Sequence, residues 1–304
     1  MSIDFFKKFY NDDIIYHYTK ASTAINFILY NKELKFSESK KSTDPIESCN
    51  HRRVIEYSSN KSLKSRTKKN NIDANEVNDF ISNLEKQFYQ ICFCKNSKED
   101  DSGIEYCTCE FKGNEELFGF TKLRMWDQYA DKYKGVCIAL SKKKILALNS
   151  EKLKLIEDDL KYLSFDELSR KKMGDIQVDY LERVGKEKYK DEIEKRVKKS
   201  FFYKHQDYKG EDEYRIGTLY DKKNCSIEKV RDELIFDKPN KLKISGCIEA
   251  IFVSSFANEK QKEELLEYAK HDLPIIEMKW KDDSFKPRDY REWMKIVNKF
   301  QNKK

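Results

Sequence analysis

The stretch IIYHYTKASTAINFILYNKELKF, residues 14–36, decides how the fold begins. Residues 14–18 are apolar or aromatic except for one histidine, which is typical of a buried strand. The next apolar residues recur at the spacing of one helical face and are Ala24, Ile25, Ile28 and Leu29. Residues 33–36 then have the pattern of a second short strand. The stretch therefore predicts strand, helix and strand in this order.

Beyond this opening, apolar strands and amphipathic helices alternate along the chain. Helical spacing recurs at 77–88 and 258–270. Short apolar runs typical of strands lie at 90–94 (QICFC), 136–140 (VCIAL), 213–220 (EYRIGTLY), 247–253 (CIEAIFV) and 274–280 (PIIEMKW). Residues 142–210 are highly charged and mostly helical in pattern, whereas residues 38–71 are irregular and basic. We therefore expect one α+β domain over residues 1–304, with a helical insertion at 142–210 and an irregular basic segment at 38–71.

The composition is that of a folded protein. Aromatic residues make up 13% of the 304 residues, whereas Gly and Pro together number 9 + 4 = 13, which excludes disordered, collagen-like and low-complexity classes. The net charge of +7 permits an anionic ligand but does not by itself indicate DNA binding.

The sequence also predicts a cytoplasmic protein that does not associate with membranes. No run of 18 apolar residues occurs, so we expect no membrane span. Residues 1–13 are polar and lack the pattern of a signal peptide. The eight cysteines are then expected as reduced thiols.

Two charged or polar motifs lie on predicted strands. Alternation along residues 14–18 places His17 on one face and both neighbouring tyrosines on the other. A histidine in a strand is either a packed structural residue or a ligand contact. Period-2 geometry likewise places Glu211, Glu213 and Arg215 on one face of a strand. This pattern fits a solvated edge strand, or carboxylates that bind a ribose hydroxyl and stabilise an oxocarbenium ion.

A third motif is the helix around residues 125–131 (MWDQYAD), on which Trp126, Tyr129 and Ala130 share one face. Such a face packs into a core, or its flat rings form the wall of a nucleobase or nicotinamide pocket.

The cysteines fall into two pairs that each share a strand face, Cys92 with Cys94 and Cys107 with Cys109. If the two segments formed a hairpin, four thiolates could hold zinc. The spacing is not that of a zinc ribbon, so reduced cysteines without a metal are expected. The chain also lacks the dinucleotide-binding GxGxxG, the phosphate loop, HExxH and GxSxG.

Several of these blocks occur together in a known order. The chain resembles a bacterial and phage family known as domain of unknown function 2971, and the resemblance spans residues 14–255. It is carried by IIYHYTKASTAINFIL (14–29), Asp44-Pro45-x-Glu47, RMWDQYADKYKGVCIAL (124–140), and Lys204 with Tyr208, Glu211, Glu213 and Arg215.

The opening Tyr-His-x-Thr strand, with its helix and second strand, is also similar to the start of ADP-ribosyltransferase-like folds. This more distant resemblance implies a split two-sheet core that binds NAD in a cleft. It implies that His17 anchors NAD, that Glu213 is the catalytic carboxylate and that Glu211 orients the acceptor. Tyr18 or Tyr129 would supply the ring that packs against nicotinamide. The other residues implied to contact NAD are Thr19, Trp126 and Arg215.

The expected function is NAD-dependent ADP-ribosyl transfer or NAD glycohydrolysis, in a toxin or a phage-defence effector. NAD would be the substrate, a protein or nucleic acid would be the acceptor, and no metal is expected. Two alternatives lack catalysis. The basic residues 61–69 and the many aromatic residues favour nucleic-acid binding, and the charged helical segment 176–203 favours a defence protein that senses a protein partner.

Overall fold

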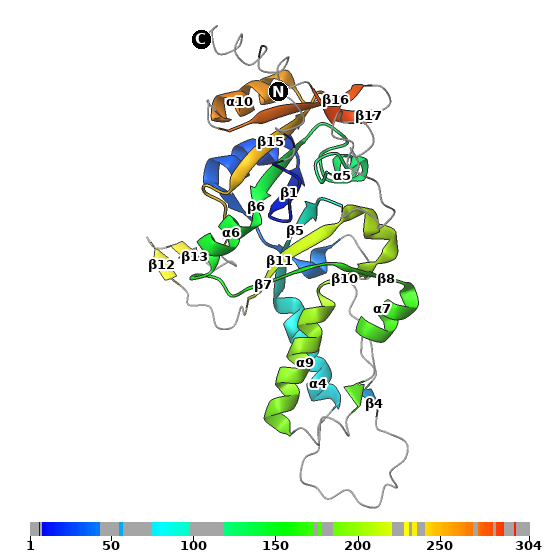
Figure 1. The fold of residues 1–304 in the computed structure, drawn as a ribbon. Helices are drawn as coiled ribbons and strands as arrows, with labels where there is room; N and C mark the ends of the chain where they lie inside the picture. The colour runs from blue at the N-terminus through cyan, green and yellow to red at the C-terminus, as the bar shows by residue number, and fades with distance from the viewer. Residues whose placement is uncertain are drawn as a thin grey trace, which may run out of the picture.

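In the part of the chain that the structure describes, nine strands form one mixed sheet (Figure 1). The computed structural model describes residues 6, 8–42, 55–56, 74–97, 118–172, 176–177, 185–220, 228–230, 233–235, 241–269, 273–281, 284–288 and 295. The strand order is β17-β16-β15-β6-β1-β5-β11-β7, and β3 pairs with β5 beside this path. The nine strands are β1 (Ile14–Thr19), β3 (Ser37–Glu38), β5 (Phe88–Lys95), β6 (Val136–Ser141), β7 (Leu155–Asp159), β11 (Glu213–Leu219), β15 (Ile248–Ser254), β16 (Ile275–Lys281) and β17 (Ser284–Pro287).

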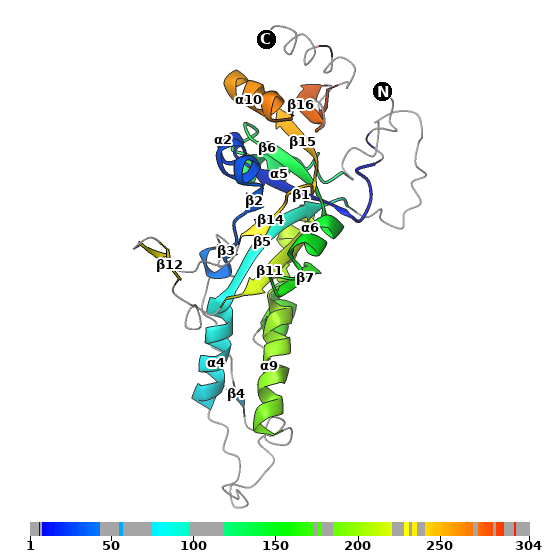
Figure 2. The same cartoon turned by 90° about the vertical axis from the view of Figure 1, so that its left-hand side faces the viewer.

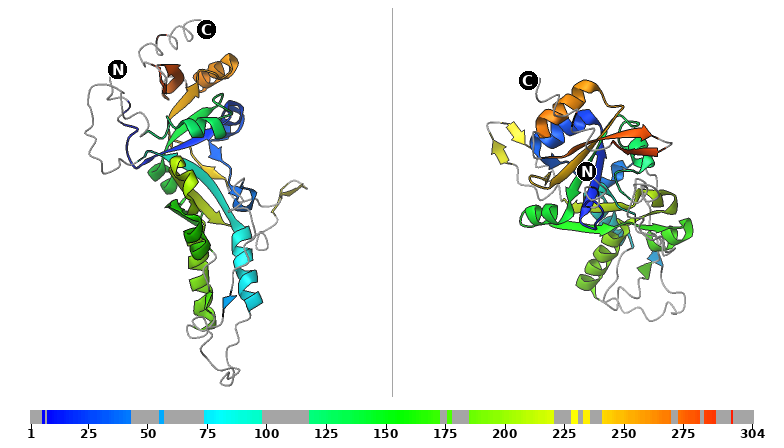
Figure 3. Two further views of the ribbon diagram at one scale, coloured as in Figure 1. Left: turned by 90° about the vertical axis from the view of Figure 1, so that its right-hand side faces the viewer. Right: turned by 45° about the horizontal axis from the view of Figure 1, so that its top comes forward.

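Helices pack around this sheet, which confirms the α+β class. Helix α10 and the π-helix η1 lie on the same side of the sheet (Figures 2 and 3). None of the described helices combines the length and the hydrophobicity that a membrane span requires. The helices are α2 (Ala21–Thr23), η1 (Ala24–Leu29), η2 (Ser39–Lys41), α4 (Ala74–Gln87), α5 (Leu123–Gln128), α6 (Lys142–Asn149), α7 (Phe165–Lys172), α9 (Lys186–Ser200), η5 (Gln206–Glu211) and α10 (Glu259–Ala269).

The remaining described strands form four short pairs outside the main sheet. They are β2 (Glu33–Leu34) with β14 (Leu242–Lys243), β4 (Ile55–Glu56) with β9 (Ile176–Gln177), β8 (Lys161–Leu163) with β10 (Tyr203–His205), and β12 (Glu228–Val230) with β13 (Glu233–Ile235).

The main sheet has an apolar core on each face. In β1, Ile15 belongs to the core that η1 and α10 cover, whereas Tyr16 and Tyr18 belong to the core that α5 covers. This is the alternation expected for a strand between two cores. All six residues of β6 are buried, which explains why the sequence there is a continuous apolar run. A third core lies between α4 and α9, which extend away from the sheet side by side (Figures 1 and 2).

The segment 142–210, expected to be a helical insertion, also contains strands. Helices α6, α7 and α9 lie within it, but β7 pairs with β11 at the edge of the main sheet. Three of the five β7 residues are exposed, so this edge strand lacks the apolar alternation that identifies a strand in a sequence. Helix α9 begins directly after Gly185, whose φ of 90° suits glycine at a helix start. Most of the predicted basic segment 38–71, like residues 178–184, lies outside the described residues.

One edge of β5 is shared by two strands, and this arrangement positions the site. Strand β1 pairs with β5 through Ile15↔Lys95 and Tyr16↔Cys94 only, within the described register. Strand β3 pairs with the other end of the same edge, at residues 89–90. Residues 91–93 of β5 lie between these two partners, whereas β11 pairs continuously along the opposite edge. The sheet is therefore parted between β1 and β5 beyond Cys94.

Candidate functional site

A cavity of about 280 Å³ lies at this parting of the sheet. Residues 91–93 of β5 line it, as do His17 of β1 and Ser37 of β3, so both neighbours of the parted edge contribute. The charged and polar residues around it come from segments far apart in the sequence. They include Lys35, Glu38, Lys41, Gln90, Tyr129, Lys204, Glu211, Glu213 and Arg215.

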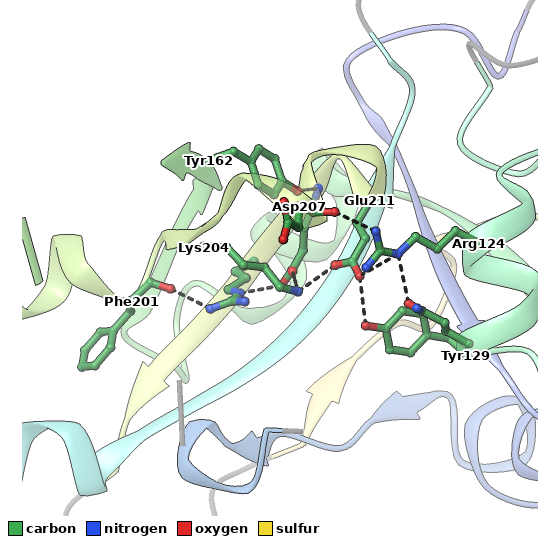
Figure 4. Close-up of polar contacts among 10 residues, drawn as sticks. Arg124, Tyr129, Tyr162, Phe201, Lys204, Asp207 and Glu211 are labelled. Atoms are coloured by element: carbon green, nitrogen blue, oxygen red, sulfur yellow. Dashed lines mark hydrogen bonds and ion pairs between the residues drawn. The ribbon is translucent and has the colours of Figure 1, made fainter. Parts of the chain in front are cut away.

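Two buried carboxylates share one ammonium group in the wall of this cavity (Figure 4). Lys204 Nζ donates to Glu211 Oε2 over 2.7 Å and to Glu213 Oε2 over 2.9 Å. The Glu211 and Glu213 side chains are 2% and 4% exposed. Two like charges this deeply buried would repel each other strongly, because the interior screens them weakly. Lys204 offsets part of this repulsion, because its ammonium group contacts both carboxylates.

A second cation contacts Glu213. Arg215 Nε donates to Glu213 Oε1 over 2.5 Å, and Arg215 Nη1 donates to the carbonyl oxygen of Phe201 over 2.8 Å. Burial by itself raises the pKa of Glu213, but the charges of Arg215 and Lys204 outweigh it and lower the pKa to about 2. Glu213 is therefore ionised at neutral pH and held in one orientation.

Glu211 lies close to Glu213 but not on the strand where the sequence placed it. It ends the 3₁₀ helix η5, and β11 begins only at Glu213. Between them Asp212 has a left-handed backbone, with φ of 42°. The prediction that Glu211 shares a strand face with Glu213 and Arg215 is therefore wrong, because Glu211 is not part of the strand. The turn at Asp212 and the shared contact with Lys204 bring the two carboxylates together instead.

Aromatic and cationic side chains hold this network in place. Tyr129 Oη donates to Glu211 Oε1 over 3.3 Å, and Arg124 Nε lies 3.8 Å from the same oxygen. Burial and the nearby Glu211 raise the pKa of Tyr129, so its hydroxyl stays protonated. The Tyr162 hydroxyl accepts from the Glu213 amide over 2.8 Å. The ring of Tyr208 lies under Lys204 Nζ, at 4.5 Å from the ring centroid.

Sequence reasoning missed several members of this network as site residues. Lys204 and Tyr208 appeared only as parts of a family pattern. Lys204 lies seven residues before Glu211 and Tyr208 lies three before it, and this closeness in sequence was the signal that could have placed them at the site. Arg124 appeared only as the first residue of the block 124–140. Tyr162 carried no signal, because its contact with Glu213 crosses a long stretch of sequence.

His17 lies at the parting of the sheet, directly after the last β1 residue that pairs with β5. Its Nδ1 lies 3.3 Å from the carbonyl oxygen of Cys92. A carbonyl can only accept, so Nδ1 carries the proton and Nε2 remains an acceptor. Burial lowers the pKa of His17, opposed by this hydrogen bond, so the imidazole is neutral at pH 7. Strand register places Tyr16, Cys94 and Glu213 on one face, so alternation directs His17 to the other. His17 and Glu213 nevertheless both line the cavity.

The other predicted site residues divide between the cavity and the core. Tyr129 lines the cavity and is 43% exposed. Trp126 is fully buried, its Nε1 donates to the Phe120 carbonyl over 2.8 Å, and it is not among the described lining residues. Tyr18 contributes to the lining, but its hydroxyl donates to the Gly119 carbonyl within the core beside α5. Thr19 is likewise not among the lining residues. The rings of Trp126 and Tyr18 are packed edge-to-face against each other, which is core packing.

The cysteine pairs are only partly described. Cys92 is exposed, lines the cavity and forms no disulfide with another described residue. Cys94 is buried, and burial raises the pKa of its thiol to about 12. The zinc hypothesis also needs Cys107 and Cys109, and both lie outside the described residues. Among the residues that are described, no group of three or more His, Cys, Asp or Glu side chains could hold a metal ion.

Comparison with known proteins agrees with one of the two resemblances. The model of the family described as "Protein of unknown function (DUF2971)" matches residues 125–216. This segment runs from α5 to β11 and carries Tyr129, Tyr162, Lys204, Glu211, Glu213 and Arg215, but not His17. Searches among curated proteins and among solved structures gave no match.

Proposed function

We propose that the protein cleaves the nicotinamide–ribose bond of NAD, by ADP-ribosyl transfer or by glycohydrolysis. The observation that supports this most is that His17 and Glu213, from opposite parts of the chain, line the same cavity. The resemblance to ADP-ribosyltransferase-like folds assigns the roles of NAD anchor and catalytic carboxylate to these two residues.

The parting of the main sheet supports the same proposal. An ADP-ribosyltransferase-like core binds NAD where two sheets separate, and here β1 leaves β5 after two residue pairs. The strands on the β1 side and those on the β5 side would then be the two halves of the split core. The cavity at the parting is at the small end of ligand pockets, which span about 300–1,000 Å³. It therefore suits the nicotinamide riboside end of NAD, with the remainder of the dinucleotide outside it.

The state of Glu213 suits it to stabilise positive charge. It is ionised, and oriented by Lys204 and Arg215. A carboxylate has about four lone-pair sites, so it can accept a further hydrogen bond from a ribose hydroxyl. As the C1′–N bond breaks, its electron pair moves to the ring nitrogen and nicotinamide leaves as a neutral molecule. The oxocarbenium ion that remains is stabilised by the fixed negative charge.

The second half of the reaction uses a nucleophile on the anomeric carbon. Water gives free ADP-ribose and a proton; an acceptor group gives an ADP-ribosyl adduct and a proton. Within this proposal, His17 Nε2 accepts from a ribose hydroxyl. Tyr129, rather than Tyr18, supplies the ring beside nicotinamide: both line the cavity, but Tyr129 is 43% exposed and Tyr18 only 7%. Glu211 positions Lys204 and Tyr129 instead of contacting the acceptor directly.

The decisive experiment measures nicotinamide release from NAD by the purified full chain. Glu213→Gln should reduce the rate by at least ~100-fold, since it removes the charge that stabilises the oxocarbenium ion. The matched control is Glu263→Gln, in an exposed glutamate of α10 that does not line the cavity, which should keep the wild-type rate. Each variant is first checked for native thermal unfolding. Equal rates for wild type and a folded Glu213→Gln variant would contradict the proposal.

A further inference from the structure

Gln90 is a buried polar side chain in the cavity whose amide oxygen has no partner among the described residues. Gln90 is 5% exposed, and its Oε1 is buried without a hydrogen bond. It also lines the cavity. Leaving a buried acceptor unpaired is unfavourable, so native proteins rarely do it unless a ligand or water supplies the donor. The orphaned oxygen is therefore available to accept a hydrogen bond from a donor that a ligand supplies.

Strand register places Gln90 on the same face as the charged network. Gln90 lies opposite Gly217 of β11, Cys92 opposite Arg215, and Cys94 opposite Glu213. Gly217 has no side chain to offer, and a Cβ there would collide with the ring of Phe88. Gln90 is thus four residues from the position of Glu213, or ~13 Å along the strand. Both side chains border one small cavity.

We infer that Gln90 is a specificity-determining residue that accepts a hydrogen bond from the carboxamide NH₂ of nicotinamide. This inference rests on the proposed function. The cavity has room for one end of a dinucleotide, so the group that Gln90 contacts belongs to the end that Glu213 holds. A primary carboxamide supplies the N–H donor that Oε1 lacks. A nicotinate carboxylate would instead set a charged acceptor against Oε1, which is unfavourable.

The test compares three dinucleotides: NAD, nicotinic acid adenine dinucleotide, and nicotinamide hypoxanthine dinucleotide. Wild-type protein should prefer NAD over the nicotinic acid analogue in kcat/KM by at least ~100-fold, because a site built to bind a donor rejects the analogue without it. In Gln90→Met this preference should fall by at least ~10-fold. Gln87→Met, in a residue of α4 that does not line the cavity, should keep it. If Gln90→Met instead changed only the preference against the hypoxanthine analogue, Gln90 would contact adenine and the inference would be wrong.

A binding measurement separates failure of the inference from failure of the proposed function. If wild type cleaves no dinucleotide, the proposed function fails, but thermal shifts with nicotinamide and nicotinic acid still test Gln90. The inference requires that nicotinamide stabilises wild type more than nicotinic acid does, and that Gln90→Met removes this difference. Gln90→Met should also raise the melting temperature of the ligand-free protein, by ~2 °C or more, because it removes an unpaired buried acceptor. A lower melting temperature together with unchanged ligand preference would assign Gln90 a structural role.

Discussion

Glu211 and Glu213 share a single ammonium group, Lys204 Nζ, at 2.7 and 2.9 Å. The two carboxylates come from different elements, the end of η5 and the start of β11. All three side chains are almost fully buried, so the charges act in an environment that screens them weakly. The stability of this part of the molecule and the ionisation of Glu213 both depend on this arrangement.

Replacing Lys204 should strongly destabilise the protein. Lys204→Met leaves two buried carboxylates short of a cation, and breaking a buried ion pair in this way costs about 3–5 kcal/mol. The free energy of unfolding from urea denaturation measures the loss. Lys209→Met, in an exposed lysine of the same 3₁₀ helix η5, should change it by less than about 0.5 kcal/mol. Equal effects of the two substitutions would show that the shared ammonium contributes little.

The stability of the protein should fall steeply in acid because of Glu213. Its folded-state pKa of about 2 is below the ordinary value of 4.5, so the unfolded chain binds the proton more readily than the folded protein does. The stability from ionised Glu213 is full above pH 4.5 and is lost as the pH falls from 4.5 toward 2. The pH dependence of urea unfolding measures this. Glu213→Gln should have a shallower slope in that window; superimposable slopes would contradict the assignment.

The ring and the hydroxyl of Tyr129 should contribute differently. Tyr129→Phe removes one 3.3 Å hydrogen bond to Glu211 but keeps the ring, so we expect a small change in KM for NAD. Tyr129→Ala removes the ring that borders the cavity, and KM should rise about 10-fold or more. Steady-state nicotinamide release measures both. If Tyr129→Phe and Tyr129→Ala had the same KM as wild type, the ring would not contact the substrate.

Trp126 should behave as a core residue. It is fully buried and contacts Tyr18 and Phe285 edge-on, so Trp126→Ala should lower the free energy of unfolding by about 3–5 kcal/mol. The more conservative Trp126→Phe should retain the fold and the KM for NAD. A folded Trp126→Phe variant with a greatly raised KM would contradict this and show that Trp126 contributes to substrate binding.

The predicted toxic role can be tested in bacteria. Expression of the wild-type chain should lower cellular NAD and slow growth, whereas Glu213→Gln at equal abundance should do neither. Growth curves and NAD measurements on the same cultures provide the comparison. Slowed growth with unchanged NAD in both cultures would favour the partner-binding or nucleic-acid-binding alternatives.

The sequence by itself determined the buried strands and the amphipathic helices. The apolar run at 136–140 is β6, buried on both faces, and the alternation around His17 is that of β1 between two cores. Such patterns are readable because side-chain burial repeats with the local geometry of the backbone. Strand β7 was not predicted, because an exposed edge strand does not need apolar alternation.

Only the tertiary structure decided the site. Glu211 lies outside the strand because of the turn at Asp212, and Lys204 contacts both carboxylates. Strands β1 and β3 pair with the two ends of one edge of β5, so residues 91–93 between them border a cavity. It also buried Trp126 and left Gln90 Oε1 without a partner in the described chain. These features depend on strand register and on contacts between residues far apart in sequence. Local periodicity cannot encode either of them, since it records only which face of an element is buried.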